Sequence, residues 1–258
     1  MKLYYLMTLF VSIISPFVVL AINPITSKPT TSSSKSSIIN PNNLPAEALL
    51  SVSHYRKTCP DAEAIIHRRM RAWINKDPTL APAIIRLHFH DCAVREAELV
   101  PQGRENTKGL IKFFEARGLN MLDLVVLSGA HTIGRSACHA FQHRLGKTPD
   151  PSLNVTLLNV VRKKCKTGYS LVDLDATTPK KFDTMYYSNL MNKKGLLSTD
   201  QQLYSDQITS PFVSALATQP NLFESQFAVS MIKLGNVQVK TRPRDKGEIR
   251  VNCYFVNA

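Results

Sequence analysis

Apolar residues recur every three or four positions along most of this chain, which is the period of one face of an α-helix. In the segment 62–75 the apolar positions are Ala62, Ile65, Ile66, Met70 and Trp73. With Asp, Thr-Pro and Gly as boundary signals, this pattern predicts helices over 62–75, 81–94, 108–116, 123–127, 178–194, 211–217 and 223–234. Gly195 is the expected end signal of the 178–194 helix. No series of alternating strands and turns is present, so the sequence predicts an all-α fold.

The first part of the chain has a different composition. Lys2 precedes an apolar run over 3–20 that ends at Ala21, which is typical of a secretory signal peptide, residues 1–21. A membrane anchor is the alternative, because the run approaches the length of a spanning helix. Residues 22–48 are rich in Ser, Thr, Pro and Asn and predict a flexible leader. The remaining residues, 49–258, are expected to form one domain, with no membrane contact after signal cleavage.

Charge and cysteine content narrow the choice of partners. The net charge is +13, from 32 Lys and Arg against 19 Asp and Glu. No basic run with interleaved aromatic residues is present, so no nucleic-acid partner is expected. Asn154-Val155-Thr156 is a glycosylation acceptor in a secreted chain. An odd number of cysteines leaves at least one without a partner in its own chain, and the five are Cys59, Cys92, Cys138, Cys165 and Cys253.

Two histidines lie in the segment Arg86-Leu87-His88-Phe89-His90-Asp91-Cys92. Arg86 and His90 are four positions apart, so a helix places them on one face, where a permanent cation and a proton acceptor could act together. Ordinary half-buried histidines are the alternative. A zinc site is a second alternative, but His88 and His90 point apart on a helix, and neither HExxH nor paired CxxC occurs.

A further histidine lies in Leu127-Ser128-Gly129-Ala130-His131-Thr132-Ile133-Gly134-Arg135. Small neighbours leave room for a large flat group beside the His131 ring. A tight turn that needs glycine for its backbone is the alternative. A metal-bound histidine usually donates its other ring N–H to a carboxylate, and Asp200 is a candidate, although nothing local in the sequence connects it to His131.

Taken in order, several segments resemble the secretory (class III) plant haem peroxidases. They are 55–60, 86–92, 127–135, 182–187, 195–201 and 247–253. The resemblance implies haem b held between distal and proximal helical halves, with hydrogen peroxide and small phenolic donors as substrates. It further implies a monomer secreted to the apoplast or cell wall, with the vacuole as the alternative destination. Acidic cell-wall polysaccharide is a second candidate partner, given the positive charge.

The same resemblance assigns roles to individual residues. His131 corresponds to the proximal iron ligand, and Asp200 to its carboxylate partner. Arg86 and His90 correspond to the distal pair that moves a proton within peroxide and stabilises the developing charge. The remaining correspondences are Phe89 in the distal pocket, Pro101 near the haem edge where aromatic donors sit, the Cys138–Cys165 disulfide, and a proximal calcium site of Thr132, Asp175, Thr178, the Lys181 carbonyl and Asp183.

The resemblance breaks after Val94-Arg95, where the chain continues directly into Glu96. Family members have on the order of a hundred residues here, enough for a layer of helices. The distal calcium site keeps at most Asp91 and the Val94 carbonyl, and Cys59, Cys92 and Cys253 lose their partners. The sequence therefore predicts a haem-peroxidase fold whose distal half is incomplete. A catalytically impaired, non-enzymatic secreted protein is the alternative function.

Overall fold

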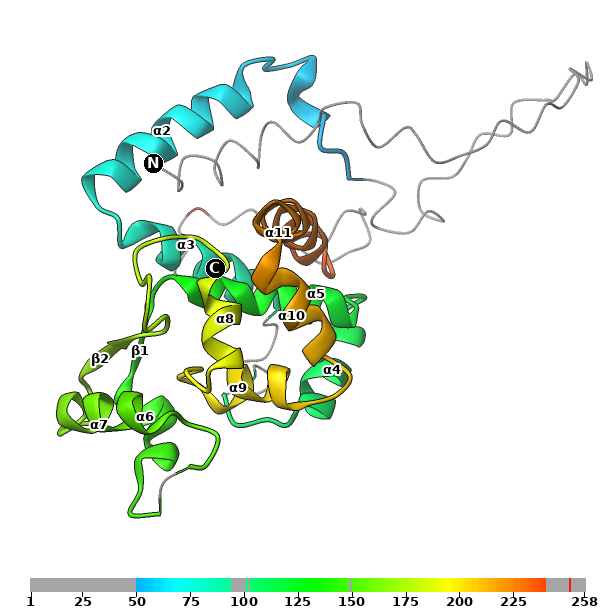
Figure 1. Ribbon diagram of the computed structural model, residues 1–258. Helices are drawn as coiled ribbons and strands as arrows, with labels where there is room; N and C mark the ends of the chain where they lie inside the picture. Colours follow the sequence, from blue (N-terminus) through cyan, green and yellow to red (C-terminus); the bar gives the residue numbers. More distant parts are fainter. Residues whose placement is uncertain (1–49, 94–100, 102, 149, 240–250, 252–258) are drawn as a thin grey trace, which may run out of the picture. The chain divides into compact units, whose positions relative to one another are not determined.

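The computed structural model of this chain describes residues 50–93, 101, 103–148, 150–239 and 251 (Figure 1). The described residues divide into two compact units: residues from 63 to 237 belong to one, and residues 50–62, 238, 239 and 251 belong to the other. In the second unit the described residues include a 3-10 turn, η4, at His54–Arg56. Within the described residues, no helix combines the length and the apolar character needed to cross a membrane.

Helices dominate the described chain, which confirms the all-α prediction. The short strands β1 (Arg135–Ala137) and β2 (Leu171–Asp173) pair antiparallel, with Arg135 opposite Asp173. Two 3-10 helices, η6 (Gly129–Thr132) and η7 (Gln142–Leu145), join longer elements. The α-helices are α2 (Ala62–Lys76), α3 (Leu80–Ala93), α4 (Thr107–Glu115), α5 (Met121–Ser128), α6 (Cys138–Phe141), α7 (Val155–Lys164), α8 (Met185–Met191), α9 (Ser198–Ser205), α10 (Ser210–Thr218) and α11 (Pro220–Gly235).

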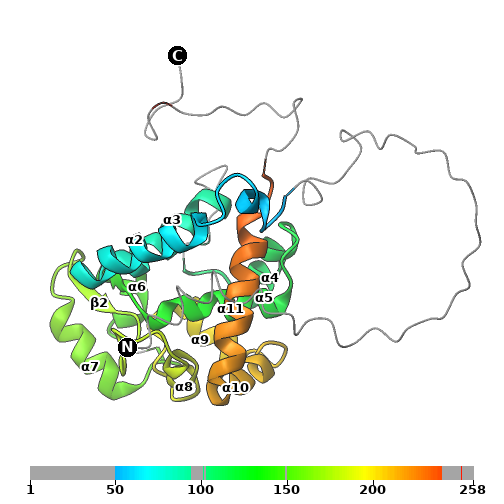
Figure 2. The same cartoon turned by 90° about the horizontal axis from the view of Figure 1, so that it is seen from above.

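The main core of the first unit forms around α5, whose residues 124–127 are all buried. Helices α4, α10 and α11 pack against α5, and α11 also packs against α3 (Figure 2). The start of α5 is fixed by a capping box, in which the Asn120 side chain accepts from the Asp123 backbone and Asp123 accepts from the Asn120 backbone. The buried Asp123 carboxylate also accepts from Ser230 and Lys233 of α11. These contacts fix α5, and thereby η6 at its end, relative to α11.

A smaller core lies beside the strands. Cys138 at the start of α6 and Cys165 at the end of α7 form a disulfide with a Cα–Cα distance of 5.6 Å, as expected from the family resemblance. Phe141 and Val161 pack around it, with Val172 and Leu196. A cross-link of this kind stabilises mainly by restricting the unfolded chain. It therefore holds α7 and β2 against α6 and β1.

The prediction of a helix over 178–194 is wrong at both ends. Helix α8 begins only at Met185, because residues 178–183 form turns: the Lys181 N–H donates to the Thr178 carbonyl at 2.9 Å, and the Asp183 carboxylate accepts from the Met185 N–H at 2.9 Å. At the other end, the left-handed residue after α8 is Lys193, with φ 57°, and not Gly195. Gly195 is small for another reason: a Cβ there would lie 2.7 Å from Leu190 Cδ2. The sequence pattern also missed α6, α7, α9 and both strands.

Helix α2 forms as predicted, but its apolar stripe is not buried. Ile66 is 61% exposed and Trp73 is 54% exposed, whereas only Ile74 of this helix is buried. On α3, Leu87 is 67% exposed. An amphipathic helix normally turns such a stripe toward a core. These apolar side chains of α2 and α3 are therefore not covered by the elements that the structure describes.

Candidate active site

His131 and Asp200 meet in the structure although they are 69 residues apart. His131 lies in η6, directly after the buried α5, and Asp200 lies in the first turn of α9. The His131 Nδ1 atom is 2.9 Å from Asp200 Oδ1. The Tyr186 hydroxyl donates to the same oxygen at 3.1 Å. Burial and the nearby Asp200 charge raise the pKa of Tyr186 well above its usual value, so this hydroxyl keeps its proton and remains a donor.

The contact with Asp200 fixes the tautomer of His131. A carboxylate only accepts hydrogen bonds, so Nδ1 must carry the proton, and Nε2 of the neutral ring keeps a free lone pair. Burial lowers the pKa of His131, but the charge and hydrogen bond of Asp200 raise it by more, so the net shift is upward. The His131 side chain is 37% accessible, against 4% for Asp200. An accessible, electron-rich imidazole with its Nδ1 proton held in place is a side chain that would bind a haem iron through its Nε2 atom.

The glycines beside His131 serve the packing and the backbone. A Cβ at Gly129 would overlap the Tyr187 hydroxyl and lie 2.6 Å from Phe223 Cε2. Gly134 has φ +97°, a backbone conformation that side chains rarely permit, and it approaches Pro82. The small size of these two residues is thus explained by close contacts and a turn. Their small size is therefore not evidence that a flat ligand binds beside His131.

Helix α3 presents Arg86 and His90 one turn apart, as the spacing predicts. Arg86 is exposed, and Phe89 packs edge-on to the half-buried His90 with ring centroids 6.0 Å apart. Partial burial and then the Arg86 charge lower the pKa of His90, which favours the neutral ring that a base requires. The charge of Arg86 also acts on His131 and slightly opposes the upward shift of its pKa.

The other candidates on and after α3 are less informative. His88 lies with its Nε2 atom 3.3 Å from the Met231 carbonyl of α11, so it packs between helices. Pro101 is half-buried. The Asp91 side chain and Val94, the expected remnant of the distal calcium site, lie outside the described residues. Among the described residues no group of three or more His, Cys, Asp or Glu side chains could hold a metal ion.

Oxygen atoms converge beside His131, at its neighbour Thr132. The Thr132 hydroxyl lies 3.3 Å from Asp175 Oδ2, 3.4 Å from the Lys181 carbonyl and 3.5 Å from Asp183 Oδ1. The Thr178 hydroxyl is 3.0 Å from Asp183 Oδ1. One hydroxyl proton cannot satisfy several acceptors, and neither carboxylate has an ion-pair partner among the described residues. Two carboxylates, two hydroxyls and a carbonyl are the hard oxygen ligands that calcium prefers.

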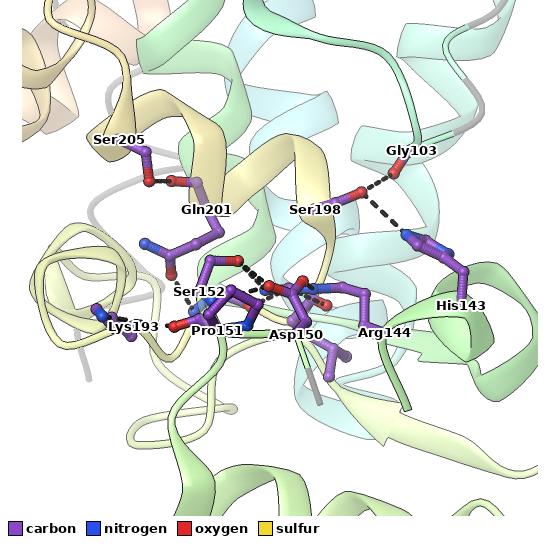
Figure 3. A network of polar contacts seen from close by, with 12 residues as sticks. Gly103, His143, Arg144, Asp150, Pro151, Ser152, Lys193, Ser198, Gln201 and Ser205 are labelled. Atoms are coloured by element: carbon purple, nitrogen blue, oxygen red, sulfur yellow. Dashed lines mark hydrogen bonds and ion pairs between the residues drawn. The ribbon is translucent and has the colours of Figure 1, made fainter. Parts of the chain in front are cut away.

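Arg144 forms a second polar network, which the sequence pattern gave no reason to expect (Figure 3). Its guanidinium is fully buried and donates from Nε to Asp150 at 2.7 Å and from Nη2 to Ser152 at 3.0 Å. Nη1 donates to the Gly195 and Leu196 carbonyls at 2.6 and 2.8 Å. Those carbonyls belong to the chain that leads into α9. Arg144 thus fixes the approach to the helix that carries Asp200.

Comparison with known proteins places these features in a family. The sequence model described as "Peroxidase" matches residues 94–219. Peroxidase 7 of Arabidopsis thaliana is 33% identical over 301 aligned positions, covering 83% of this chain and 86% of the relative. Peroxidase N1 of Nicotiana tabacum is 30% identical, covering 80% of this chain and 90% of the relative. Peroxidase 12 of Arabidopsis thaliana is 30% identical, covering 79% and 82%.

The alignment lengths also reveal a gap. The alignment with Peroxidase 7 has 301 positions, although the covered 83% of this 258-residue chain amounts to only about 214 residues. About 87 positions of the alignment therefore have no residue in this chain. The family model begins to match at residue 94, beside the junction expected from the sequence. With more than four fifths of the Arabidopsis relative covered, the chain belongs to the class III plant peroxidase family.

Proposed function

We propose that this chain is a secreted haem peroxidase that reduces hydrogen peroxide and oxidises small phenolic donors in one-electron steps. Family membership implies haem and hydrogen peroxide. The observation that carries the proposal is the 2.9 Å contact between His131 Nδ1 and Asp200, because it leaves Nε2 of an anchored ring free for the iron. Haem, when bound, supplies the iron centre that takes oxidising equivalents from peroxide and passes them on singly.

The distal residues handle the proton and the charge. The pKa of His90 is lowered, so its ring is neutral, and its basic ring nitrogen accepts a proton from one oxygen of hydrogen peroxide. His90 then returns that proton to the other peroxide oxygen, which leaves as water. Arg86 stabilises the negative charge that develops on the departing oxygen. Phe89 packs against the core beside His90 and helps to hold it in place.

We assign the oxygen cluster around Thr132 as a calcium site. Its ligands are Thr132, Asp175, Thr178, the Lys181 carbonyl and Asp183, with the contacts given above. Because Thr132 follows His131 directly, a cation here fixes the backbone that carries the proposed iron ligand. The distal calcium site is expected to be lost, since only Asp91 and Val94 remain of it.

The proposal also covers processing and location. Residues 1–21 act as a signal peptide, residues 22–48 as a leader, and residues 49–258 as the peroxidase domain with its internal deletion near 95–96. The product is secreted to the apoplast or cell wall, in keeping with its family, and the vacuole is the alternative. The net charge of +13 makes acidic cell-wall polysaccharide a second candidate partner.

A catalytically impaired, peroxidase-derived protein is the second candidate function. Two observations favour it: about 87 positions of the Peroxidase 7 alignment are missing, and apolar side chains of α2 and α3 are exposed. The expected loss of disulfide partners for Cys59, Cys92 and Cys253 also favours the impaired protein, since each lost disulfide typically lowers the free energy of unfolding by about 2–5 kcal/mol. We therefore expect weaker haem retention and lower turnover than in a full-length relative.

Haem titration and turnover of a phenol decide between the two functions. Haem binding with a high-spin, five-coordinate spectrum, lost in His131→Ala, supports the proximal assignment. Turnover that falls roughly 10²- to 10⁴-fold in His90→Ala supports the distal one. His88→Ala on the same helix is the control, because the His88 Nε2 atom lies 3.3 Å from the Met231 carbonyl of α11, so this side chain packs between helices. Haem binding without turnover establishes the impaired protein, and turnover unaffected by His90→Ala refutes the mechanism.

A further inference from the structure

The first residue of α9 contacts a segment far away in the sequence (Figure 3). The Ser198 hydroxyl donates to the Gly103 carbonyl at 2.8 Å, across 95 residues. Gly103 lies two positions after Pro101, the residue expected near the aromatic donor. Ser198 lies two positions before Asp200, the partner of His131. One short helix end thus connects the proposed donor edge with the proposed proximal site.

The proton on Ser198 has a defined direction. A carbonyl only accepts, so the single hydroxyl proton of Ser198 goes to Gly103. His143 Nε2 lies 3.2 Å from the same hydroxyl oxygen and must therefore donate to it. Partial burial, followed by the charges of Arg104 and Arg144, lowers the pKa of His143. The His143 ring can donate from Nε2 to Ser198 in two states: as the neutral ring with its proton on Nε2, or as the protonated ring.

Other polar contacts flank the Ser198–Gly103 hydrogen bond. On the α9 side, Arg144 binds the Gly195 and Leu196 carbonyls just ahead of Ser198. On the other side, Gly103 has φ 81°, and the Asn106 side chain caps α4 by accepting from Gly109. The residue ahead of Ser198, Leu197, offers α9 no side-chain cap. The Ser198 hydroxyl is therefore committed to Gly103, and does not cap its own helix.

We propose that Ser198 is a positioning residue for donor oxidation. By holding the Gly103 carbonyl, with His143 behind it, Ser198 restrains Gly103, two positions after Pro101, relative to the helix that carries Asp200. The inference rests on the proposed peroxidase function and extends it to the site of the phenolic donor. Loss of the hydroxyl loosens the donor edge and leaves the contact between His131 and Asp200 unchanged.

Three variants of the full chain test this inference. Ser198→Ala removes the hydroxyl, and Ser198→Thr restores one at the same position. Ser205→Ala is the matched control, because the Ser205 hydroxyl donates to Gln201 of its own helix at 3.1 Å. Hydrogen exchange of the peptide spanning 101–109 reports on the tether with or without haem. The dissociation constant and KM of guaiacol, and the Soret band, report on the donor and the proximal sites.

We expect faster exchange at 101–109 and a guaiacol dissociation constant raised about 2- to 10-fold in Ser198→Ala, the effect of one lost hydrogen bond. The Soret band and kcat stay unchanged, Ser198→Thr recovers most of the loss, and Ser205→Ala behaves as the parent. Unchanged exchange, or an equal effect of Ser205→Ala, overturns the tether. A changed Soret band shows that Ser198 acts through Asp200 and overturns the donor role. If the chain binds no haem, the peroxidase function and the donor role are both refuted. Hydrogen exchange at 101–109 then still shows whether the Ser198–Gly103 hydrogen bond restrains this segment.

Discussion

Replacing Arg144 by methionine tests how strongly one buried side chain supports the site. Methionine fills a similar volume but donates no hydrogen bond. The change leaves the Gly195 and Leu196 carbonyls without the donor that lies 2.6 and 2.8 Å away, and leaves Asp150 without its ion-pair partner. Since those carbonyls precede α9, the effect reaches the helix that bears Ser198 and Asp200.

The expected size follows from these contacts. A hydrogen bond to a charged group contributes about 1.5–3 kcal/mol, and each buried acceptor left unpaired costs about 1–3 kcal/mol. Methionine regains part of this by burying apolar surface. Asp150 is partly accessible and keeps its Ser152 bonds at 2.6 and 2.8 Å, so water can replace some of what it loses. We expect Arg144→Met to lower the free energy of unfolding by about 3–5 kcal/mol, as for one removed partner of a buried pair.

Urea unfolding followed by far-ultraviolet circular dichroism, with the disulfide intact, measures this difference. Arg144→Lys should be nearly as destabilising, because an ammonium group lacks the planar fork that reaches several acceptors. Asp150→Asn should cost less, since the buried guanidinium then keeps its two carbonyl partners. A loss below about 1 kcal/mol in Arg144→Met would show that the network contributes no more than an exposed ion pair.

Three further predictions concern acid stability, helix capping and calcium. Burial raises the pKa of Asp150, but the hydrogen bonds from Ser152 and Arg144 lower it by more. Its stabilising effect is therefore complete above the unfolded pKa of about 3.9 and is lost as the pH falls through the lower folded value, so unfolding at pH 5, 4 and 3 should show a steeper loss in the parent than in Asp150→Asn. Asp123→Ala removes a cap and the buried bonds to α11 and should lower the free energy of unfolding in urea by about 2–4 kcal/mol. Removal of calcium with EDTA should lower Tm by several degrees in the parent and by much less in Asp183→Asn, which already lacks one anionic ligand.

Matched controls make each of these outcomes decisive. Lys233→Met removes one contact of Asp123 and keeps the capping box, so it should cost less than Asp123→Ala. Magnesium should not restore the Tm that calcium restores, because magnesium demands a smaller octahedral shell. Equal acid sensitivity of Asp150→Asn and the parent would contradict the pH argument, and an unchanged Tm in EDTA would contradict the calcium assignment.

Local sequence patterns predicted most helices correctly, because the spacing of apolar residues reflects the geometry of a single helix. The 3.6-residue period identified α2, α3, α4, α5, α10 and α11. The helix over 178–194 was wrong at its start because residues 178–183 form turns, with the Asp183 carboxylate accepting from the Met185 N–H where α8 begins, and no hydrophobic pattern records such local bonds. Helix α7 was missed, although Asn154 caps it by accepting from Thr156 and Leu157, a signal that the sequence does contain.

By itself, the sequence determined the all-α class, the histidine motifs and, through its resemblance to a family, the Cys138–Cys165 pair. The resemblance also named Asp200 as the carboxylate partner of His131, but only the tertiary structure shows the two side chains in contact, since nothing near either residue encodes a contact across 69 positions. It also decided that Ser198 bonds to Gly103 and that Arg144 is buried, when charged side chains are otherwise mostly exposed. Helix α2 shows that an apolar pattern in the sequence does not by itself determine burial. Its sequence specifies an apolar stripe, but burial of that stripe needs a partner surface, and Trp73 is exposed because burial depends on what the rest of the chain supplies.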